Sequence, residues 1–452
     1  MKPSFAPLRR ANHVRVPDEL QPVCTVDATE AAPENDGCSA ADRARIWRAV
    51  EALYRTGAYP AVAFSLRQRG RLVLNRTLGH AYGNGPDDLP DAPKRLLTPQ
   101  MPVGIFSASK AVTATLVHLL AEDGAVKLGR PVAYYLPAFA AHGKGRITIA
   151  ELLAHRGGIA NFALPAGERR VELLADWERC VALLCAATPV AAGRPAYHAL
   201  TGAYILGELI QRLTGQPLGN YLDTRLRRPL GMKYFTYGLA REHRPQAARN
   251  YVAGVPVRFP VSTLIKRELL VPFDAIVEFS NSDLGMDAVV PAGNMFTTAE
   301  ELSRFYQLLL DDGVYQGRRL IKSETISRML RPVGRTRFDG TLRIPMRYSE
   351  GFMLGAHPYG LFGPASGDAY GHVGFMNIYS WADARRDISC SLLVTGKAVF
   401  GSHLLALLGL LNTVSRVCPL LRGAAASSRL RLHAPSAASH RAGTHCSFEF
   451  PA

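Results

Sequence analysis

The chain of 452 residues is 48% hydrophobic and 20% charged, a balance typical of a globular protein and not of a disordered or fibrous one. Its formal net charge of +16 could favour a nucleic acid or an anionic surface, but the basic residues are spread along the chain without zinc-finger spacing, an RNA-recognition signature or a basic helix. We therefore expect no nucleic-acid partner.

The beginning of the chain predicts a flexible tail over residues 1–38, because Pro, Asp, Glu and Ala dominate there without apolar periodicity. Its basic residues are not followed by an apolar segment, so we expect no secretory signal. The seven Cys are scattered and include no C-x-x-C pair, which favours a reducing compartment. The longest apolar stretch, residues 404–411, is too short to cross a membrane, so we expect a cytoplasmic protein without a membrane span.

A helix and a β-hairpin are the first predicted elements. Ser39 followed by Asp42 is an N-cap pattern, and apolar residues recur at helical spacing as far as Tyr54. The apolar runs 61–66 and 71–74 then predict two strands, joined by a short turn that contains a glycine.

The middle of the chain is predicted to be mostly helical. One helix begins at Ser107 and ends at a Gly124 cap, a second spans residues 201–214, and a third has Thr298 as its N-cap and continues to residue 310.

Strands return near the C-terminus, where the runs 375–381 and 388–395 predict a second hairpin. Residues 401–416 predict a closing helix, and residues 419–452, rich in Ser, Ala, Arg and His, predict a flexible tail. Helices and antiparallel strands are therefore segregated along the chain, which indicates an α+β fold.

The segment Ser107-Ala108-Ser109-Lys110 is the first candidate for chemistry. Three positions apart at a helix start, Ser107 and Lys110 share one face, so the amine can reach the hydroxyl. Burial would disfavour the charged amine and make it a proton acceptor. A lone S-x-x-K also arises by chance, with Ser107 as an N-cap and Lys110 as a solvated residue.

A second candidate, the segment Tyr197-His198-Ala199, precedes a predicted helix. A neighbouring Lys ammonium would lower the pKa of Tyr197, so that this hydroxyl could share the general-base work. Taken alone, Tyr197 is more often a partly buried core aromatic.

A third candidate, the segment Gly371-His372-Val373-Gly374-Phe375, is expected to open a strand at the edge of a cleft. Its glycines would let a ligand approach the backbone, and the Phe375 N–H could join the Ser107 N–H as an oxyanion hole. The alternatives for His372 are a structural histidine or a metal ligand.

Several motifs of other enzyme classes are missing from the chain. No H-E-x-x-H occurs, which disfavours a metal centre, and no G-x-S-x-G occurs, which disfavours an α/β-hydrolase. Neither G-x-G-x-x-G nor a Walker A sequence is present, so we expect no cofactor.

The three candidate segments, in this order, resemble the motifs of the serine β-lactamase and penicillin-binding-protein superfamily, and most closely those of the family VIII carboxylesterases. The likeness spans residues 41–416 and includes further segments at residues 151–159, 207–210, 229–232 and 291–295.

The resemblance implies a β-lactamase/transpeptidase-like fold within a catalytic unit of residues 39–418. An antiparallel sheet flanked by helices (residues 41–115 and 285–416) would carry an inserted, mainly helical part (residues 116–284). The implied site consists of the nucleophile Ser107, the shared bases Lys110 and Tyr197, and oxyanion or substrate-binding roles for Phe375, His372, Gly374 and His198.

The sequence departs from penicillin-recognising members of that superfamily at two motifs. Ala199 stands where they carry Asn, and His372 where they carry Lys, so the amide and the cation that hold a β-lactam are missing. We therefore predict a serine hydrolase that cleaves small-molecule carboxylic esters through an acyl-enzyme on Ser107. The alternatives are a transacylase, peptidase or β-lactamase of the same superfamily, or a catalytically silent scaffold.

Overall fold

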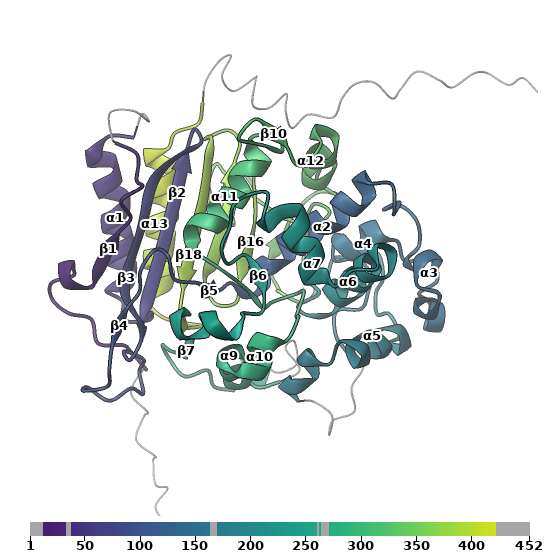
Figure 1. Cartoon of the computed structure of the whole chain (residues 1–452), viewed down its shortest axis with the longest axis horizontal. Helices are drawn as coiled ribbons and strands as arrows, with labels where there is room; N and C mark the ends of the chain where they lie inside the picture. The colour runs from purple at the N-terminus through teal and green to yellow at the C-terminus, as the bar shows by residue number, and fades with distance from the viewer. Residues whose placement is uncertain (1–11, 33–37, 163–169, 260–261, 264–270, 422–452) are drawn as a thin grey trace, which may run out of the picture.

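The computed structural model describes residues 12–32, 38–162, 170–259, 262–263 and 271–421 (Figure 1). Its largest element is an antiparallel sheet that combines the beginning and the end of the chain. The order across this sheet is β1 (Cys24–Val26), β3 (Arg71–Tyr82), β2 (Ala61–Gln68), β18 (Ile388–Val394), β17 (Ile378–Asp383), β16 (Ala369–Gly374) and β13 (Met353–Leu354), and β4 (Arg95–Leu96) also pairs with β3.

The strands of this sheet pair as two hairpins that meet in its middle. β2 and β3 form the first predicted hairpin, with Arg69 and Gly70 at positive φ in the turn. β17 and β18 form the second, and β18 pairs with β2, where Leu392 lies opposite Phe64. Segments that are far apart in sequence therefore share one buried sheet.

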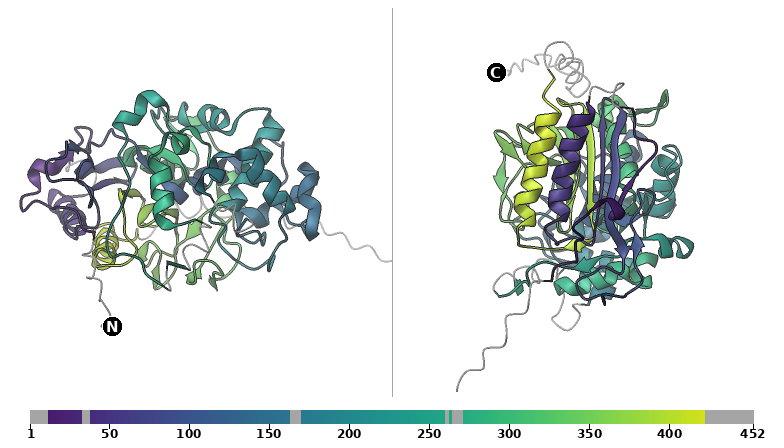
Figure 2. Two further views of the ribbon diagram at one scale, coloured as in Figure 1. Left: turned by 90° about the horizontal axis from the view of Figure 1, so that it is seen from below. Right: turned by 90° about the vertical axis from the view of Figure 1, so that its left-hand side faces the viewer.

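Helices cover both faces of the sheet. α1 (Ala40–Tyr54) and α13 (His403–Val417) lie side by side on one face, as the right-hand view of Figure 2 shows, and α11 (Ala299–Leu310) packs against the other. Ser39 caps α1 by accepting a hydrogen bond from the Asp42 N–H, and Thr298 caps α11 in a capping box with Glu301. Both helix starts were predicted from these caps, because a cap is a local pattern.

The remaining helices lie mainly beyond the β16 side of the sheet (Figure 1). They include α2 (Ser109–Glu122), α3 (Val132–Tyr135), α4 (Ile149–Leu153), α5 (Trp177–Ala186), α6 (Thr201–Thr214), α7 (Leu218–Leu222), α9 (Phe273–Asn281), α10 (Asp283–Asp287) and α12 (Ser323–Leu330). A small sheet of β5 (Val103–Gly104), β8 (Met295–Thr297) and β6 (Thr236–Tyr237) lies beside the start of α2. The expected α+β class, an antiparallel sheet with flanking helices, is confirmed.

The N-terminal boundary expected from the sequence is wrong in part. Cys24–Val26 form β1, which pairs with residues 76–78 of β3, so the expected tail does not extend over this segment. A three-residue edge strand of this kind forms because its partner strand is present, so its own sequence is too short to show a recognisable strand pattern. Val14, Leu20 and Val23 of the same expected tail are also buried. Of the expected tails, residues 1–11, 33–37 and 422–452 lie outside the described residues.

Two element starts near the predicted site also differ from expectation. The α-helix expected from Ser107 begins at Ser109, because residues 106–108 form a 3-10 turn. The strand expected from residue 375 begins at Ile378, because residues 375–377 form the turn between β16 and β17. His372 therefore lies near the end of β16 and does not open a strand.

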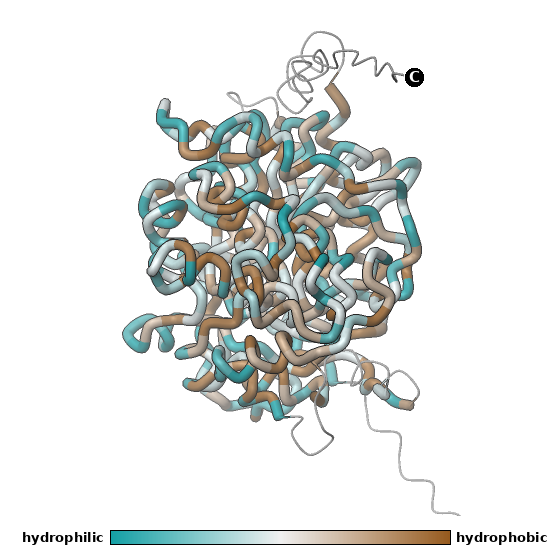
Figure 3. Tube along the Cα trace, turned by 90° about the vertical axis from the view of Figure 1, so that its right-hand side faces the viewer, coloured by the Kyte–Doolittle hydropathy of each residue, from teal (hydrophilic) through white to brown (hydrophobic). Residues whose placement is uncertain are grey.

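Hydrophilic stretches concentrate in the outer loops, and hydrophobic ones run through the middle of the molecule (Figure 3). Among the described residues, no helix combines the length and the apolar character that crossing a membrane would require.

Candidate active site

The 3-10 turn Phe106–Ala108 presents Ser107 at the N-terminal end of α2. Phe106 has a φ of +47°, a left-handed value that is rare outside glycine and turns the chain sharply just before Ser107. Ser109 stabilises this turn, because its buried hydroxyl donates to the Phe106 carbonyl (2.5 Å) and accepts from the Met295 N–H of β8 (3.1 Å). Ser107 itself stays partly exposed.

Lys110 lies on the first turn of α2, where its Nζ is 3.0 Å from Ser107 Oγ and donates to the Ala292 carbonyl at 2.8 Å. The side chain is buried, and desolvation holds the pKa of Lys110 well below its usual value. The pairing of Ser and Lys expected from the S-x-x-K spacing is therefore present in the structure, with an amine that tends to be neutral.

Tyr197 comes from the segment before α6, and the Lys110 Nζ lies 5.1 Å from the centre of its ring. Its phenol forms a hydrogen bond with Ser107, yet burial raises its pKa above the ordinary value. The expectation that a lysine cation lowers this pKa is wrong. Desolvation of the phenolate outweighs the hydrogen bond with Ser107, so Tyr197 keeps its proton and can donate it.

Two buried residues that the sequence did not single out hold Tyr197 in place. The Asp339 carboxylate accepts from the backbone N–H groups of Tyr197 (3.1 Å) and Leu342 (2.8 Å) and from the Tyr348 hydroxyl (2.9 Å). The His155 ring packs 4.7 Å from the Tyr197 ring, centre to centre. In the sequence, His155 was noted only as part of the segment 151–159 that resembles the superfamily, and no motif included Asp339.

Phe375 and Gly374 lie at the end of β16, against the Phe106–Ala108 turn. The Phe375 ring contacts the Phe106 ring at 5.5 Å between centres. A Cβ on Gly374 would stand 2.4 Å from the Ile105 carbonyl oxygen, and one on Gly371 would stand 2.2 Å from the Ser380 carbonyl oxygen. Both positions therefore require glycine because the protein's own backbone approaches them closely. Gly374 also lines the cavity at Ser107, whereas Gly371 does not.

The two candidate histidines, His372 and His198, are buried and do not line the cavity at Ser107. His372 is buried, donates from Nδ1 to the Val373 carbonyl (2.9 Å), and has its pKa lowered to about 3 by desolvation. His198 is buried on the other side of Lys110, in a separate cavity of about 20 Å³, and burial lowers its pKa to about 3 as well. Neither side chain lines the cavity at Ser107, so neither is placed for the substrate contact expected of it.

A cavity of about 520 Å³ opens at Ser107 and Tyr197, between the sheet and the helical part. Val373, Gly374 and Phe375 line it from β16 and the following turn. In the described ranges, no group of three or more His, Cys, Asp or Glu side chains is arranged to hold a metal ion. The arrangement brings a hydroxyl, a desolvated amine and a phenol together at one end of a cavity, and these are components of acyl transfer.

Replacing Gly374 by Ala should lower kcat/KM by about 10²-fold, because the new Cβ would push the end of β16 away from the turn that holds Ser107. Steady-state kinetics together with the melting temperature would measure this. Gly409→Ala on α13 is the matched control, since a Cβ there meets nothing within 4 Å. Equal activity of the two variants would contradict a positioning role for Gly374.

Comparison with known proteins gives matches over most of the chain. The family model described as Beta-lactamase matches residues 46–409. The esterase/beta-lactamase LipL of Mycobacterium tuberculosis is 29% identical over 307 residues, which are 64% of this chain and 68% of LipL.

Two solved structures superpose on more than four fifths of the chain. A family VIII carboxylesterase has 26% sequence identity and a TM-score of 0.69, over 85% of this chain and 98% of the carboxylesterase. A penicillin-binding protein homologue from Caulobacter crescentus has 23% identity and a TM-score of 0.69, over 83% of this chain and 97% of that homologue, and shares the fold.

Proposed function

The chain belongs to the β-lactamase family of serine hydrolases, and from this premise we propose that it is a carboxylesterase that forms an acyl-enzyme on Ser107. The observation that carries the proposal is the 3.0 Å separation between Ser107 Oγ and an Lys110 amine whose pKa burial lowers. A hydroxyl becomes an effective nucleophile when a base within hydrogen-bond reach can take its proton.

In the proposed acylation, Ser107 Oγ attacks the ester carbonyl carbon while its proton passes to the Lys110 Nζ. The Ser107 and Phe375 N–H groups stabilise the tetrahedral oxyanion. The bond to the alcohol oxygen then breaks, and this oxygen takes the phenolic proton of Tyr197, which the Lys110 ammonium replaces. Tyr197 therefore acts as a proton donor and relay, as its raised pKa requires.

Deacylation uses the same groups in the reverse direction. Water attacks the acyl carbon, its proton passes to Lys110, and Ser107 Oγ leaves as the hydroxyl once the proton returns to it. The acid is released and the starting protonation states are restored.

Two substitutions support a preference for an ester over a β-lactam: Ala199 supplies no side-chain amide, and His372 supplies no lysine cation, at the positions that hold a β-lactam in penicillin-recognising relatives. Ala199 lines the cavity with a methyl group, and His372 is both buried and neutral. A β-lactam carboxylate would therefore find no cation from the third motif, and a buried charge without a partner is costly. The family VIII carboxylesterase is named for an ester substrate, whereas LipL is named both an esterase and a beta-lactamase.

We expect kcat/KM for p-nitrophenyl butyrate to exceed that for a chromogenic cephalosporin by roughly 10³ or more, because the site lacks the polar partners of a lactam. Both substrates can be followed by absorbance with one enzyme preparation. Comparable turnover of the cephalosporin would favour a β-lactamase.

Labelling with a fluorophosphonate probe, followed by peptide mapping, tests the nucleophile directly. Modification at Ser107 supports the proposal. An unlabelled, folded protein would instead favour a catalytically silent scaffold.

A further inference from the structure

The cavity at Ser107 is large and its wall is almost entirely apolar. Its volume of about 520 Å³ lies within the range of roughly 300–1,000 Å³ that is typical of small-molecule sites. The wall is built by side chains from several parts of the fold, among them Leu174, Ile276, Phe279, Leu342, Met346 and Leu361. Methionine adapts to irregular shapes, so this wall suits a flexible apolar chain.

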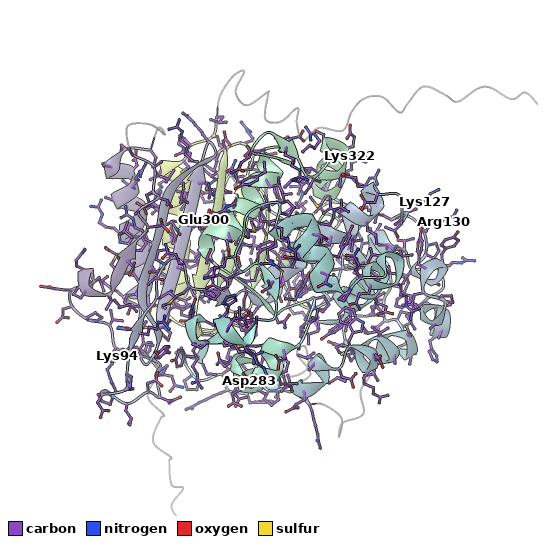
Figure 4. The ribbon with its side chains drawn as sticks, viewed as in Figure 1. Lys94, Lys127, Arg130, Asp283, Glu300 and Lys322 are labelled. Atoms are coloured by element: carbon purple, nitrogen blue, oxygen red, sulfur yellow. The ribbon has the colours of Figure 1, made fainter. Side chains whose placement is uncertain are left out.

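Among the described residues that line this cavity there is no Lys, Arg, Asp, Glu or His, and the only titratable side chains are those of tyrosines. The contrast with the whole chain is large, because the sequence holds 53 Lys and Arg and 37 Asp and Glu. Charged side chains such as Lys94, Lys127 and Arg130 stand at the outside of the molecule (Figure 4). An anionic substrate would therefore meet no counterion among the described residues of this wall.

Two of the polar side chains in the wall are already engaged in hydrogen bonds within the protein. The Asn294 amide donates to the Ala288 carbonyl (2.7 Å) and accepts from the Val290 N–H (2.9 Å). The Ser280 hydroxyl donates to the Val277 carbonyl at 2.7 Å. Hydrogen bonds from these groups to a substrate would compete with existing ones, so the wall offers mainly apolar contact.

We propose that the physiological substrate is an uncharged ester with a long apolar chain, of the fatty-acyl or fatty-alcohol class, that fills this cavity. This inference rests on the proposed esterase function and goes beyond it by naming the substrate class. Each methylene that moves from water into an apolar wall contributes about a fourfold gain in binding. A carboxylate in the same place would lose its hydration without gaining an ion pair from the described residues of the wall.

A series of p-nitrophenyl esters from acetate to dodecanoate, each below its aggregation concentration, measures the effect of acyl length. We expect kcat/KM to rise by about 10²-fold or more between acetate and octanoate. Six fully buried methylenes, at about fourfold each, would give a larger rise, so this expectation already allows for incomplete burial of the chain. A second series, acetate esters of alcohols from ethanol to dodecanol followed by acid release, tests the alcohol side. A rise in the first series assigns the cavity to the acyl chain, and a rise in the second assigns it to the alcohol.

Leu342→Asp places a carboxylate in the wall and should lower the octanoate-to-acetate ratio of kcat/KM by at least tenfold. Leu405→Asp on α13 is the matched control, because Leu405 is 75% exposed and lies outside the cavity wall. This control should leave the ratio unchanged. Circular dichroism and the melting temperature report whether both variants fold.

The failure of this inference differs from the failure of the proposed function. Hydrolysis of acetate at least as fast as octanoate, with no rise along the alcohol series, would overturn the long-chain substrate while leaving the esterase intact. A folded protein that hydrolyses no member of either series and leaves Ser107 unlabelled would overturn the esterase itself.

Discussion

Replacing Ser107 by Ala should lower kcat for ester hydrolysis by roughly 10⁴ or more, the scale on which a nucleophile acts together with its base. The acyl-enzyme needs the Oγ atom, and neither Lys110 nor Tyr197 can substitute for it in forming an ester. The partly exposed hydroxyl contributes little packing, so the melting temperature should not fall. Burst-phase kinetics with a p-nitrophenyl ester would show whether the acyl-enzyme still forms.

Ser109→Ala is the matched control for Ser107→Ala, and we expect the opposite pattern from it. Its hydroxyl is buried and satisfies the Met295 N–H, so its loss leaves a buried donor unpaired at a cost of about 1–3 kcal/mol of stability. Activity should fall much less than in Ser107→Ala. Equal loss of kcat in both variants, or an active Ser107→Ala, would exclude Ser107 as the nucleophile.

Replacing Lys110 by Arg should lower kcat by roughly 10² or more, the usual scale of general-base catalysis. The guanidinium stays protonated and cannot accept the Ser107 proton, although it keeps a positive charge at this position. Lys110→Met keeps the apolar stem and removes the amine, and it should be as inactive while remaining folded. Stopped-flow acylation rates would separate these effects from product release.

The pH dependence of acylation provides an independent check on Lys110. Desolvation lowers its pKa, so the amine should be neutral over a wider range of pH than a free lysine would be. The acylation rate should fall as pH decreases through that lowered pKa, because the protonated amine has no lone pair, and should level off above it. A normal rate in Lys110→Arg, with an unchanged pH profile, would show that Lys110 supplies only charge.

Tyr197→Phe should lower kcat by about 10² through loss of the proton donor, because the ring and its packing against His155 are kept. The loss should be smaller for esters whose alcohol is already a good leaving group. A p-nitrophenyl ester and an ethyl ester of the same acid make this comparison, and equal losses on both would contradict the proton-donor role.

The sequence by itself determined the features that depend on neighbouring residues. Caps and helical periodicity placed α1 and α11, because the groups that satisfy a helix end lie within one turn of it. The spacing of Ser107 and Lys110 placed the hydroxyl and the amine together for the same reason. The segregation of helices and strands along the chain predicted the α+β class, and the resemblance of its motifs to a known superfamily implied the fold that the structure and the family match confirm.

Only the tertiary structure decided what depends on burial and on distant partners. The sequence predicted a lowered pKa for Tyr197, but desolvation by the surrounding fold raises this pKa and lowers that of Lys110. Asp339 reaches Tyr197 from 142 residues away, and Gly374 is explained by the Ile105 carbonyl that approaches it. Solvent exclusion and long-range contacts are properties of the packed chain, so no local pattern of residues could have given them.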